Sequence, residues 1–171
     1  MARVRSFPPI SHPTATVLLL GSMPGRASLE AGQYYAHPRN AFWPLMETLL
    51  GIYSAWPYEK RKSGLIDQKI AVWDVLQACS RPGSLDSDIV PSSMRANDFA
   101  RFFREHPRIR LIGFNGATAW QAYRRLVLPD LEPGHKALRT VVLPSTSPAM
   151  ASLNVAAKTE AWRLALGLEQ R

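Results

Sequence analysis

Residues 16–25 read Thr-Val-Leu-Leu-Leu-Gly-Ser-Met-Pro-Gly, a short apolar run that stops at Gly21. A continuous apolar run of this length, ended by glycine, is typical of a strand that is buried on both faces. Similar runs follow at residues 70–76, 109–113 and 140–143. Because both faces of such strands must be covered, these runs predict a parallel sheet between helices.

Segments with helical spacing of apolar residues separate the four runs. Pro44 suits the first turn of one helix, Asp98 suits the N-cap of another, and a third follows residues 115–116. We expect the helices to bury Leu45, Leu49 and Ile52; Phe99, Phe102 and Phe103; Trp120, Tyr123 and Val127; and, in a last helix from about Val155, Trp162, Ala165 and Leu166. The alternation predicts one three-layer α/β/α domain over residues 1–171, with a central four-stranded, mainly parallel sheet and residues 1–14 as an N-terminal extension.

Charge and composition narrow the function classes. The 171 residues include 21 Lys and Arg against 13 Asp and Glu, giving a formal net charge of +8, and 16 of the cations are arginine. Arginine makes forked contacts with phosphate, so a nucleic acid fits this charge, although general solubility or a compositional bias would also produce it. The single cysteine, Cys79, excludes a disulfide framework and a cysteine-based zinc site.

Several other classes lack their sequence signatures. The longest apolar run, residues 15–20, is too short to cross a bilayer, and the basic N-terminus leads into Pro8 and Pro9 instead of a targeting segment. Phosphate-binding glycine motifs and a nucleophile elbow are missing, and the four histidines have no metal-ligand spacing. We therefore expect no cofactor, no metal, no membrane association and a cytoplasmic location.

Polar or turn-forming residues follow each predicted strand. They occupy residues 21–25, 77–82, 115–116 and 144–148. Because the carboxyl ends of parallel strands meet at one edge of a sheet, these segments should lie together. The sequence therefore predicts a binding or catalytic site at that edge.

Residues 32–43 read Gly-Gln-Tyr-Tyr-Ala-His-Pro-Arg-Asn-Ala-Phe-Trp and join the first strand to its helix. A loop with this many aromatic rings must pack either on the protein's own core or on a flat ligand. Core packing is the expected role of Phe42 and Trp43 at the start of the helix. For Tyr34 and Tyr35, core packing and stacking on a nucleic-acid base remain equally open.

The same segments resemble a known family. Residues 21–25, residues 33–43 and residues 143–148 (Leu-Pro-Ser-Thr-Ser-Pro) are similar to motifs of the uracil-DNA glycosylase superfamily, most closely of its hypoxanthine-DNA (deoxyinosine) glycosylase branch, family 6. Weaker matches follow in the same order, at residues 73–76, 83–89 and 113–116. The resemblance covers most of the chain, from about residue 17 to residue 149.

This resemblance implies a monofunctional DNA glycosylase of base excision repair. Such an enzyme flips a deaminated base, here most closely hypoxanthine, out of double- or single-stranded DNA and hydrolyses its N-glycosidic bond. We expect it to act as a monomer. A uracil- or mismatch-specific glycosylase and a non-catalytic DNA-binding module of the same fold are the alternatives.

One position departs from the uracil- and mismatch-specific branches. Those branches carry Asp or Asn in the first motif to position the attacking water, and this chain has Met23 there. The resemblance points to Asn40 as the catalytic, water-positioning residue, with Asn115 as a second candidate, although Asn115 and Gly116 are also a typical turn pair. Lysine is missing from the motif positions, which favours hydrolysis over a Schiff-base mechanism.

The same resemblance assigns the residues that contact the substrate. Tyr35 is expected to stack on the base. Asp74 is expected either to accept an N–H of the purine as an ionised carboxylate or to bond the backbone of the next loop. The full set of expected substrate contacts is Gly21, Ser22, Met23, Pro24, Tyr35, Asp74, Ser145, Thr146 and Ser147.

Contacts to DNA phosphates are expected around the same edge. Ser145 and its loop suit phosphate binding, although a simple strand-exit turn has the same composition. Arg39 is a second phosphate contact, and His37 either contacts phosphate or holds its loop. The phosphates that flank the flipped base are expected to contact Arg26, Arg39, Arg81 and Arg95. Met150 is the candidate for the apolar wedge that fills the space left by the flipped base. Asp86 and Asp88 are expected to fix their own loop.

Overall fold

A four-stranded sheet forms the centre of the protein. The computed structural model describes residues 3–168. The strand order is β3-β2-β6-β7, and each neighbouring pair is parallel: β2 (Val17–Gly21), β3 (Ile70–Asp74), β6 (Leu111–Asn115) and β7 (Arg139–Leu143). This confirms the four predicted runs as strands of a parallel sheet, with shifts of one or two residues at their ends.

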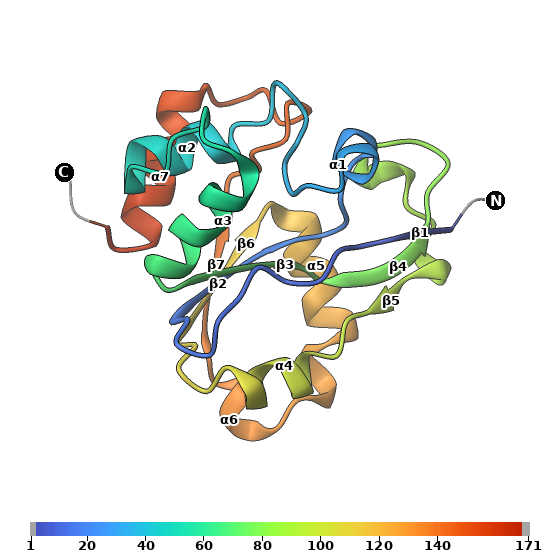
Figure 1. The fold of residues 1–171 in the computed structure, drawn as a ribbon. Coiled ribbons are helices and arrows are strands. Elements are labelled where there is room, and N and C mark those ends of the chain that lie inside the picture. Colours follow the sequence, from blue (N-terminus) through green and yellow to red (C-terminus); the bar gives the residue numbers. More distant parts are fainter. Residues whose placement is uncertain (1–2, 169–171) are drawn as a thin grey trace.

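Helices cover both faces of this sheet and complete three layers (Figure 1). Leu19 and Val72 point into one apolar core, while Leu18 and Leu20 point into the other. The first core packs against α2 (Phe42–Leu50), α3 (Tyr58–Asp67) and α7 (Val155–Ala165), and the second packs against α4 (Phe99–Glu105) and α5 (Ala117–Leu126). Within residues 3–168, every helix is too short or too polar to cross a bilayer.

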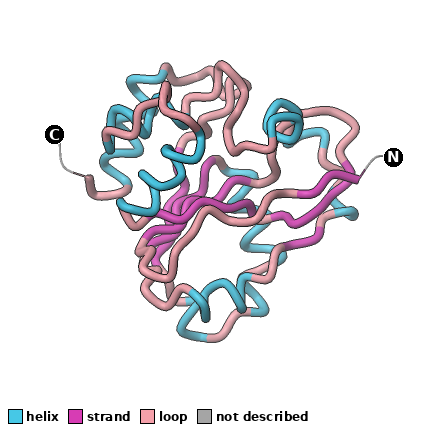
Figure 2. The backbone as a smooth tube through the Cα atoms, in the orientation of Figure 1, coloured by secondary structure: helices cyan, strands magenta, loops and turns pink. Residues whose placement is uncertain are grey.

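A smaller antiparallel sheet lies beside the main one (Figure 2). Its strands follow the order β1-β4-β5: β1 (Arg3–Arg5), β4 (Leu76–Ser80) and β5 (Arg95–Ala96). The prediction that residues 70–76 form one strand is therefore wrong at its end, because the chain leaves the parallel sheet after Asp74 and continues as β4. For the same reason residues 77–82 are mostly strand, not the expected loop.

The N-terminal segment packs on both sheets. β1 pairs with β4, and Ile10 forms an antiparallel bridge with Val72 of β3. Residues 1–2 and 169–171 of the predicted domain lie outside the described residues. Shorter elements complete the chain: α1 (Arg26–Ala31), α6 (Pro133–Lys136) and the 3-10 turns η1 (Asp86–Asp88), η2 (Pro91–Ser93) and η3 (Leu128–Asp130).

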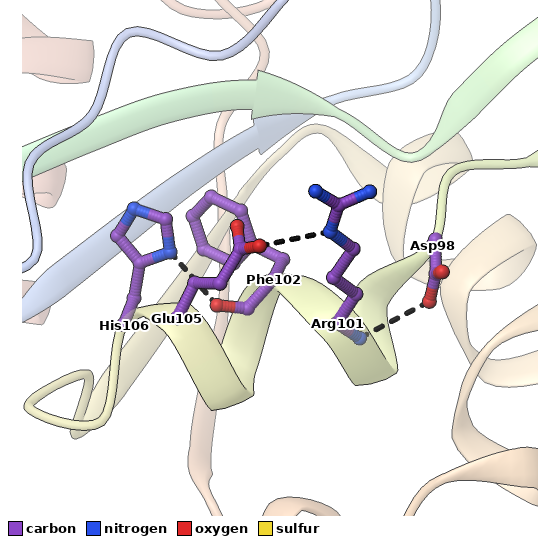
Figure 3. Close-up of polar contacts among 5 residues, drawn as sticks. All are labelled: Asp98, Arg101, Phe102, Glu105 and His106. Carbon is purple, nitrogen blue, oxygen red and sulfur yellow. Dashed lines mark hydrogen bonds and ion pairs between the residues drawn. The ribbon is translucent and has the colours of Figure 1, made fainter.

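Helix α4 shows how local signals set the element boundaries (Figure 3). Asp98 accepts a 3.1 Å hydrogen bond from the N–H of Arg101, which confirms it as the predicted N-cap. At the other end, Nδ1–H of His106 donates a 2.8 Å hydrogen bond to the carbonyl of Phe102, and its ring stacks on the Phe102 ring. The three phenylalanines predicted for one face of this helix are all buried.

Candidate active site

An open cleft of about 680 Å³ lies at the carboxyl edge of the parallel sheet, and its volume is in the range of ligand pockets in proteins. Three of the four predicted edge segments line it, through residues 21–25, 115–116 and 145–148. Residues 77–82 do not, since most of them belong to β4, and residues 84–87 around η1 take their place. The sequence therefore predicted the edge correctly and one of its segments wrongly.

The first motif, after β2, forms the floor of the cleft. A Cβ at Gly21 would lie 2.7 Å from Asp74 Oδ1 and 3.2 Å from the Tyr35 hydroxyl, so a residue without a side chain is needed where these groups approach the strand. Ser22 donates a 2.6 Å hydrogen bond to Asp86 Oδ1, which fixes the η1 loop as expected. Met23 packs into the apolar core and offers the cleft neither an amide nor a carboxyl group.

Core packing accounts for most of the aromatic loop. Phe42 and Trp43 are buried, as predicted. Tyr34 is also buried, and its hydroxyl donates a 3.0 Å hydrogen bond to the carbonyl of Pro8. Trp43 Nε1–H in turn donates to the carbonyl of Tyr34 at 2.9 Å. Of the two roles that the sequence left open for Tyr34, the structure supports core packing.

Tyr35 has a different environment. One face of its ring stacks on Phe42 at a centroid distance of 4.1 Å, and its φ of 57° lies in the left-handed region. Its hydroxyl is buried against the cleft floor and has no hydrogen-bond partner in the described structure. Burial and the neighbouring Asp74 raise the pKa of Tyr35 far above its usual value, and the nearby Asn115 amide offsets only part of this rise. The hydroxyl therefore keeps its proton and is a hydrogen-bond donor at any physiological pH.

Asp74 ends β3 directly beside Gly21, in the parallel register of β2 and β3, and is only 3% exposed. Burial and, second, the charge of Asp86 raise the pKa of Asp74 to about 8, because Arg81 offsets only part of their effect. Its Oδ2 has no hydrogen-bond partner among the described residues. Of the two expected roles, a bond to the backbone of the next loop has no counterpart among the described contacts, and the raised pKa favours the protonated over the ionised carboxyl at pH 7.

The expectation that Arg81 contacts a DNA phosphate is wrong. It is 4% exposed, and its guanidinium donates to the carbonyls of Gly83 (3.0 Å) and Pro24 (2.7 Å). Arg81 therefore joins two loops of the site from inside the protein, where a DNA phosphate does not reach. Arg95 is exposed on β5 but is not part of the cleft wall.

The remaining expected phosphate contacts lie at the mouth of the cleft. Arg26 and Arg39 are both exposed and line it. His37 also lines the mouth, and its Nδ1 accepts a hydrogen bond from the N–H of Arg39, so it holds its loop. Leu85, which sequence analysis missed, is 51% exposed at the same mouth. The only sign of this in the sequence is that Leu85 is an apolar residue between the polar residues Ser84 and Asp86.

The two candidate asparagines have different surroundings. Asn40 lines the cleft, and its Oδ1 accepts a 2.9 Å hydrogen bond from the N–H of Phe42, which fixes the amide at the start of α2. Asn115 donates to Thr146 Oγ1 and accepts from the N–H of Thr146, both at 2.9 Å. Both ends of the Asn115 amide therefore hold the loop after β7, whereas no described residue binds the NH₂ group of Asn40.

Lys158 supports the loop after β7 from behind. Its Nζ donates hydrogen bonds to the carbonyls of Met150 (2.6 Å) and Ser147 (3.4 Å), and the side chain is 4% exposed. Burial lowers its pKa. Sequence analysis missed this role, although Lys158 lies one turn before Trp162, on the buried face of α7. Ser147 and Met150 both line the cleft, so Lys158 positions part of its wall.

The described residues do not form a set of metal ligands. Within residues 3–168, His, Cys, Asp and Glu side chains do not gather in any group of three or more that could hold a metal ion. The polar groups that line the cleft include hydroxyls, amides, the Asp74 carboxyl and the Asp86 carboxyl that Ser22 binds. Such groups position and polarise an organic substrate by hydrogen bonds.

The fold and cleft define a three-layer α/β protein with its site at the carboxyl edge of a parallel sheet. The family model of the uracil DNA glycosylase superfamily matches residues 8–166, and the chain belongs to this superfamily.

Individual relatives are similar over most of their length. A hypoxanthine DNA glycosylase of Methanosarcina acetivorans is 36% identical over 85% of this chain and 87% of its own. A hypoxanthine DNA glycosylase of Methanosarcina barkeri is 35% identical over 66% of this chain and 70% of its own. A solution NMR structure from M. acetivorans, described as a candidate uracil DNA glycosylase, has a TM-score of 0.75 and 35% identity over 94% of this chain and 96% of its own.

The raised pKa of Asp74 predicts how stability depends on pH. The folded protein keeps a proton on this carboxyl up to about pH 8, whereas the unfolded chain releases it near 3.8, so the wild type loses stability as the pH rises through this range. We expect Asp74→Asn to melt at a higher temperature than the wild type at alkaline pH, with a difference that shrinks toward pH 4. Asp67→Asn, at the exposed end of α3, is the matched control. A gain for Asp74→Asn that is equal at all pH values would contradict this assignment.

Lys158 predicts a second stability effect. Lys158→Met keeps most of the apolar stem but leaves the carbonyls of Ser147 and Met150 without their donor. We expect a loss of about 1–3 kcal/mol in the free energy of unfolding, measured by urea denaturation. Lys136→Met, at an exposed lysine of α6, serves as the control. Equal stability of Lys158→Met and the wild type would show that the two carbonyls do not depend on this ammonium group.

Proposed function

We propose that this protein is a monofunctional DNA glycosylase that removes hypoxanthine from DNA. The observation that carries the proposal is the make-up of the cleft. Amide and hydroxyl groups and the carboxyls of Asp74 and Asp86 line it, arginines lie at its mouth, and lysine is missing from its described wall. These groups suit hydrolysis of an N-glycosidic bond without a Schiff base. Relatives at 35–36% identity that carry the name hypoxanthine DNA glycosylase support the choice of base.

The reaction breaks the bond between C1′ of deoxyribose and N9 of the base. Its electron pair leaves with the base, while a water oxygen bonds to the cation-like C1′. The proton that water releases ends on the departed base through solvent exchange. A nucleophile that meets an oxocarbenium-like carbon needs positioning more than strong activation.

Asn40 is the residue that we assign to this positioning. Its amide is fixed by the N–H of Phe42 and faces the cleft with an unbound NH₂ group and a second carbonyl lone pair. Met23 supplies no competing group. Asn115 has a supporting role in this proposal, because Thr146 occupies both ends of its amide.

DNA binding fits the mouth of the cleft. Arg26 and Arg39 are exposed there, and the loop from Ser145 to Ser147 brings backbone and hydroxyl groups to the same side. Forked guanidinium contacts to phosphate, together with the net charge of +8, provide the attraction that does not depend on sequence and weakens with salt. We propose that the protein acts as a monomer on DNA that contains a deaminated base, in the cytoplasm of its cell.

A panel of oligonucleotides tests the proposed function. Each carries a single hypoxanthine, xanthine or uracil, in a duplex or a single strand, and is treated with protein and then with alkali. We expect scission at hypoxanthine, and none with the protein alone, because a monofunctional enzyme leaves the strand intact. Scission at uracil only would overturn the substrate assignment. No scission at any base would favour a DNA-binding module of the same fold.

Asn40→Ala tests the catalytic assignment. Loss of a positioned water should lower single-turnover excision by at least about 100-fold, while binding to the same oligonucleotide changes little. Gln121→Ala, which removes an exposed amide on α5, is the control. Normal excision by Asn40→Ala would show that another group positions the water.

A further inference from the structure

Two buried polar atoms on the cleft floor have no hydrogen-bond partner among residues 3–168. They are Oδ2 of Asp74 and the hydroxyl oxygen of Tyr35, and they are the only such atoms of the described cleft wall. Both side chains lie against Gly21, where a Cβ would come within 2.7 Å of Asp74 Oδ1 and 3.2 Å of the Tyr35 hydroxyl. Because buried polar groups are normally paired, two orphan groups side by side in an open cleft indicate a bound partner that satisfies both.

Neighbouring polar groups do not fill this role. Ser22 holds Asp86, and Thr146 binds the carbonyl oxygen and one N–H of Asn115. The other N–H of Asn115 faces the Tyr35 hydroxyl as a donor, so it provides no acceptor for the Tyr35 O–H. The guanidinium of Arg81 donates to two backbone carbonyls through Nε and Nη2, and its Nη1 is bonded to neither Asp74 nor Tyr35. Among residues 3–168, the Tyr35 O–H therefore has no acceptor and Asp74 Oδ2 has no partner, and a bound molecule can supply both.

Burial and, second, the charge of Asp86 favour the protonated form of the Asp74 carboxyl. Asp86 faces it from η1 and Arg81 from the segment after β4, while Tyr35 and Tyr34 face it from the loop between α1 and α2. Burial and Asp86 outweigh Arg81, so that the pKa of Asp74 is about 8. A neutral carboxyl donates through O–H, and Tyr35 donates through its own hydroxyl.

We infer that Asp74, in its neutral form, and Tyr35 donate a pair of hydrogen bonds to the 6-oxo oxygen of the purine as it leaves. This inference rests on the proposed function and assigns the substrate class as 6-oxopurines. When the bond from C1′ to N9 breaks, the electron pair spreads over the base and places negative charge on that oxygen. Two fixed donors stabilise this charge more strongly in the transition state than in the substrate. The step adds no proton transfer, because both donors keep their protons.

The pair also discriminates between bases. Adenine has an amino group at the position where hypoxanthine has its 6-oxo oxygen. The O–H groups of Tyr35 and Asp74 would then face N–H donors and would have no acceptor. A donor pair in this position therefore favours the deaminated purine over its parent base.

The backbone of Tyr35 supports a functional role for its hydroxyl. A tyrosine rarely adopts a φ of 57°, and stacking on Phe42 holds it there. The strained backbone and the stacked ring together place the hydroxyl beside Asp74. Such strain is found preferentially where a side chain must be held for binding or catalysis.

The experiment measures single-turnover excision of hypoxanthine from a duplex between about pH 6 and pH 10. The wild-type rate should fall as the pH rises through about 8, because ionised Asp74 loses its donor and repels the oxygen. Asp74→Asn keeps an N–H donor at every pH, so this fall should disappear. Asp74→Ala and Tyr35→Phe should each excise about 100-fold more slowly at pH 7. The exposed residues Asp67 and Tyr53 provide the matched controls, Asp67→Asn and Tyr53→Phe, which should behave as the wild type.

A second substrate separates a chemical role from a structural one. Purine that lacks the 6-oxo group offers the two donors nothing to bind, so Asp74→Ala and Tyr35→Phe should remove it as fast as the wild type does. An equal loss on both substrates would overturn the inference, as would a fall above pH 8 that persists in Asp74→Asn. Wild-type protein that releases no hypoxanthine at any pH would overturn the proposed function and this inference with it. If the wild-type protein releases hypoxanthine but the variants do not behave as described, only the assignment of the donor pair is wrong.

Discussion

The contact between Asp74 and Gly21 determines the chemistry of the cleft. Parallel pairing of β2 with β3 places these two residues opposite each other at the carboxyl edge of the sheet. Since Gly21 has no side chain, the carboxyl approaches the strand end closely and is buried there beside the Tyr35 hydroxyl. Burial keeps the carboxyl neutral. A larger residue at position 21 would separate the two groups, and the floor would lose its arrangement.

The surrounding structure holds this floor in place without occupying it. Arg81 ties the first motif to the loop before η1, Ser22 restrains Asp86, and Lys158 supports the loop after β7. Each of these groups acts on a neighbouring segment and not on Asp74 itself. Two buried polar atoms without partners reduce the stability of a folded protein, and active sites are where such a loss is regularly retained. The two apolar cores on either side of the sheet supply the compensating stability.

Sequence patterns were sufficient for the main sheet and for the location of the site. Short apolar runs that end at polar or glycine-containing turns encode buried parallel strands, and the carboxyl edge follows from the topology. The pattern failed at residues 70–76, since the apolar character continues through Val75 into β4 although the chain leaves the parallel sheet. A buried strand of the antiparallel sheet and a buried strand of the parallel sheet have the same apolar pattern in the sequence.

Other differences arise from contacts between residues far apart in the chain. Whether Tyr34 faces the core or a ligand depends on the carbonyl of Pro8, and the burial of Arg81 depends on that of Pro24. The protonation of Asp74 likewise depends on its distance from Asp86 and Arg81. Residue types alone do not encode such distances, and so the sequence predicted which residues gather at the cleft but not their hydrogen-bond partners or protonation.

The protonation state of Asp74 is the most direct test of this account. The side-chain carboxyl can be followed by carbon-13 NMR in protein labelled at aspartate, with Asp74→Asn used to assign its signal. This carboxyl should titrate with a midpoint at about 8. A midpoint near the ordinary aspartate value of 3.8 would contradict it, because Asp74 would then be ionised at neutral pH and could not donate a hydrogen bond to the leaving base.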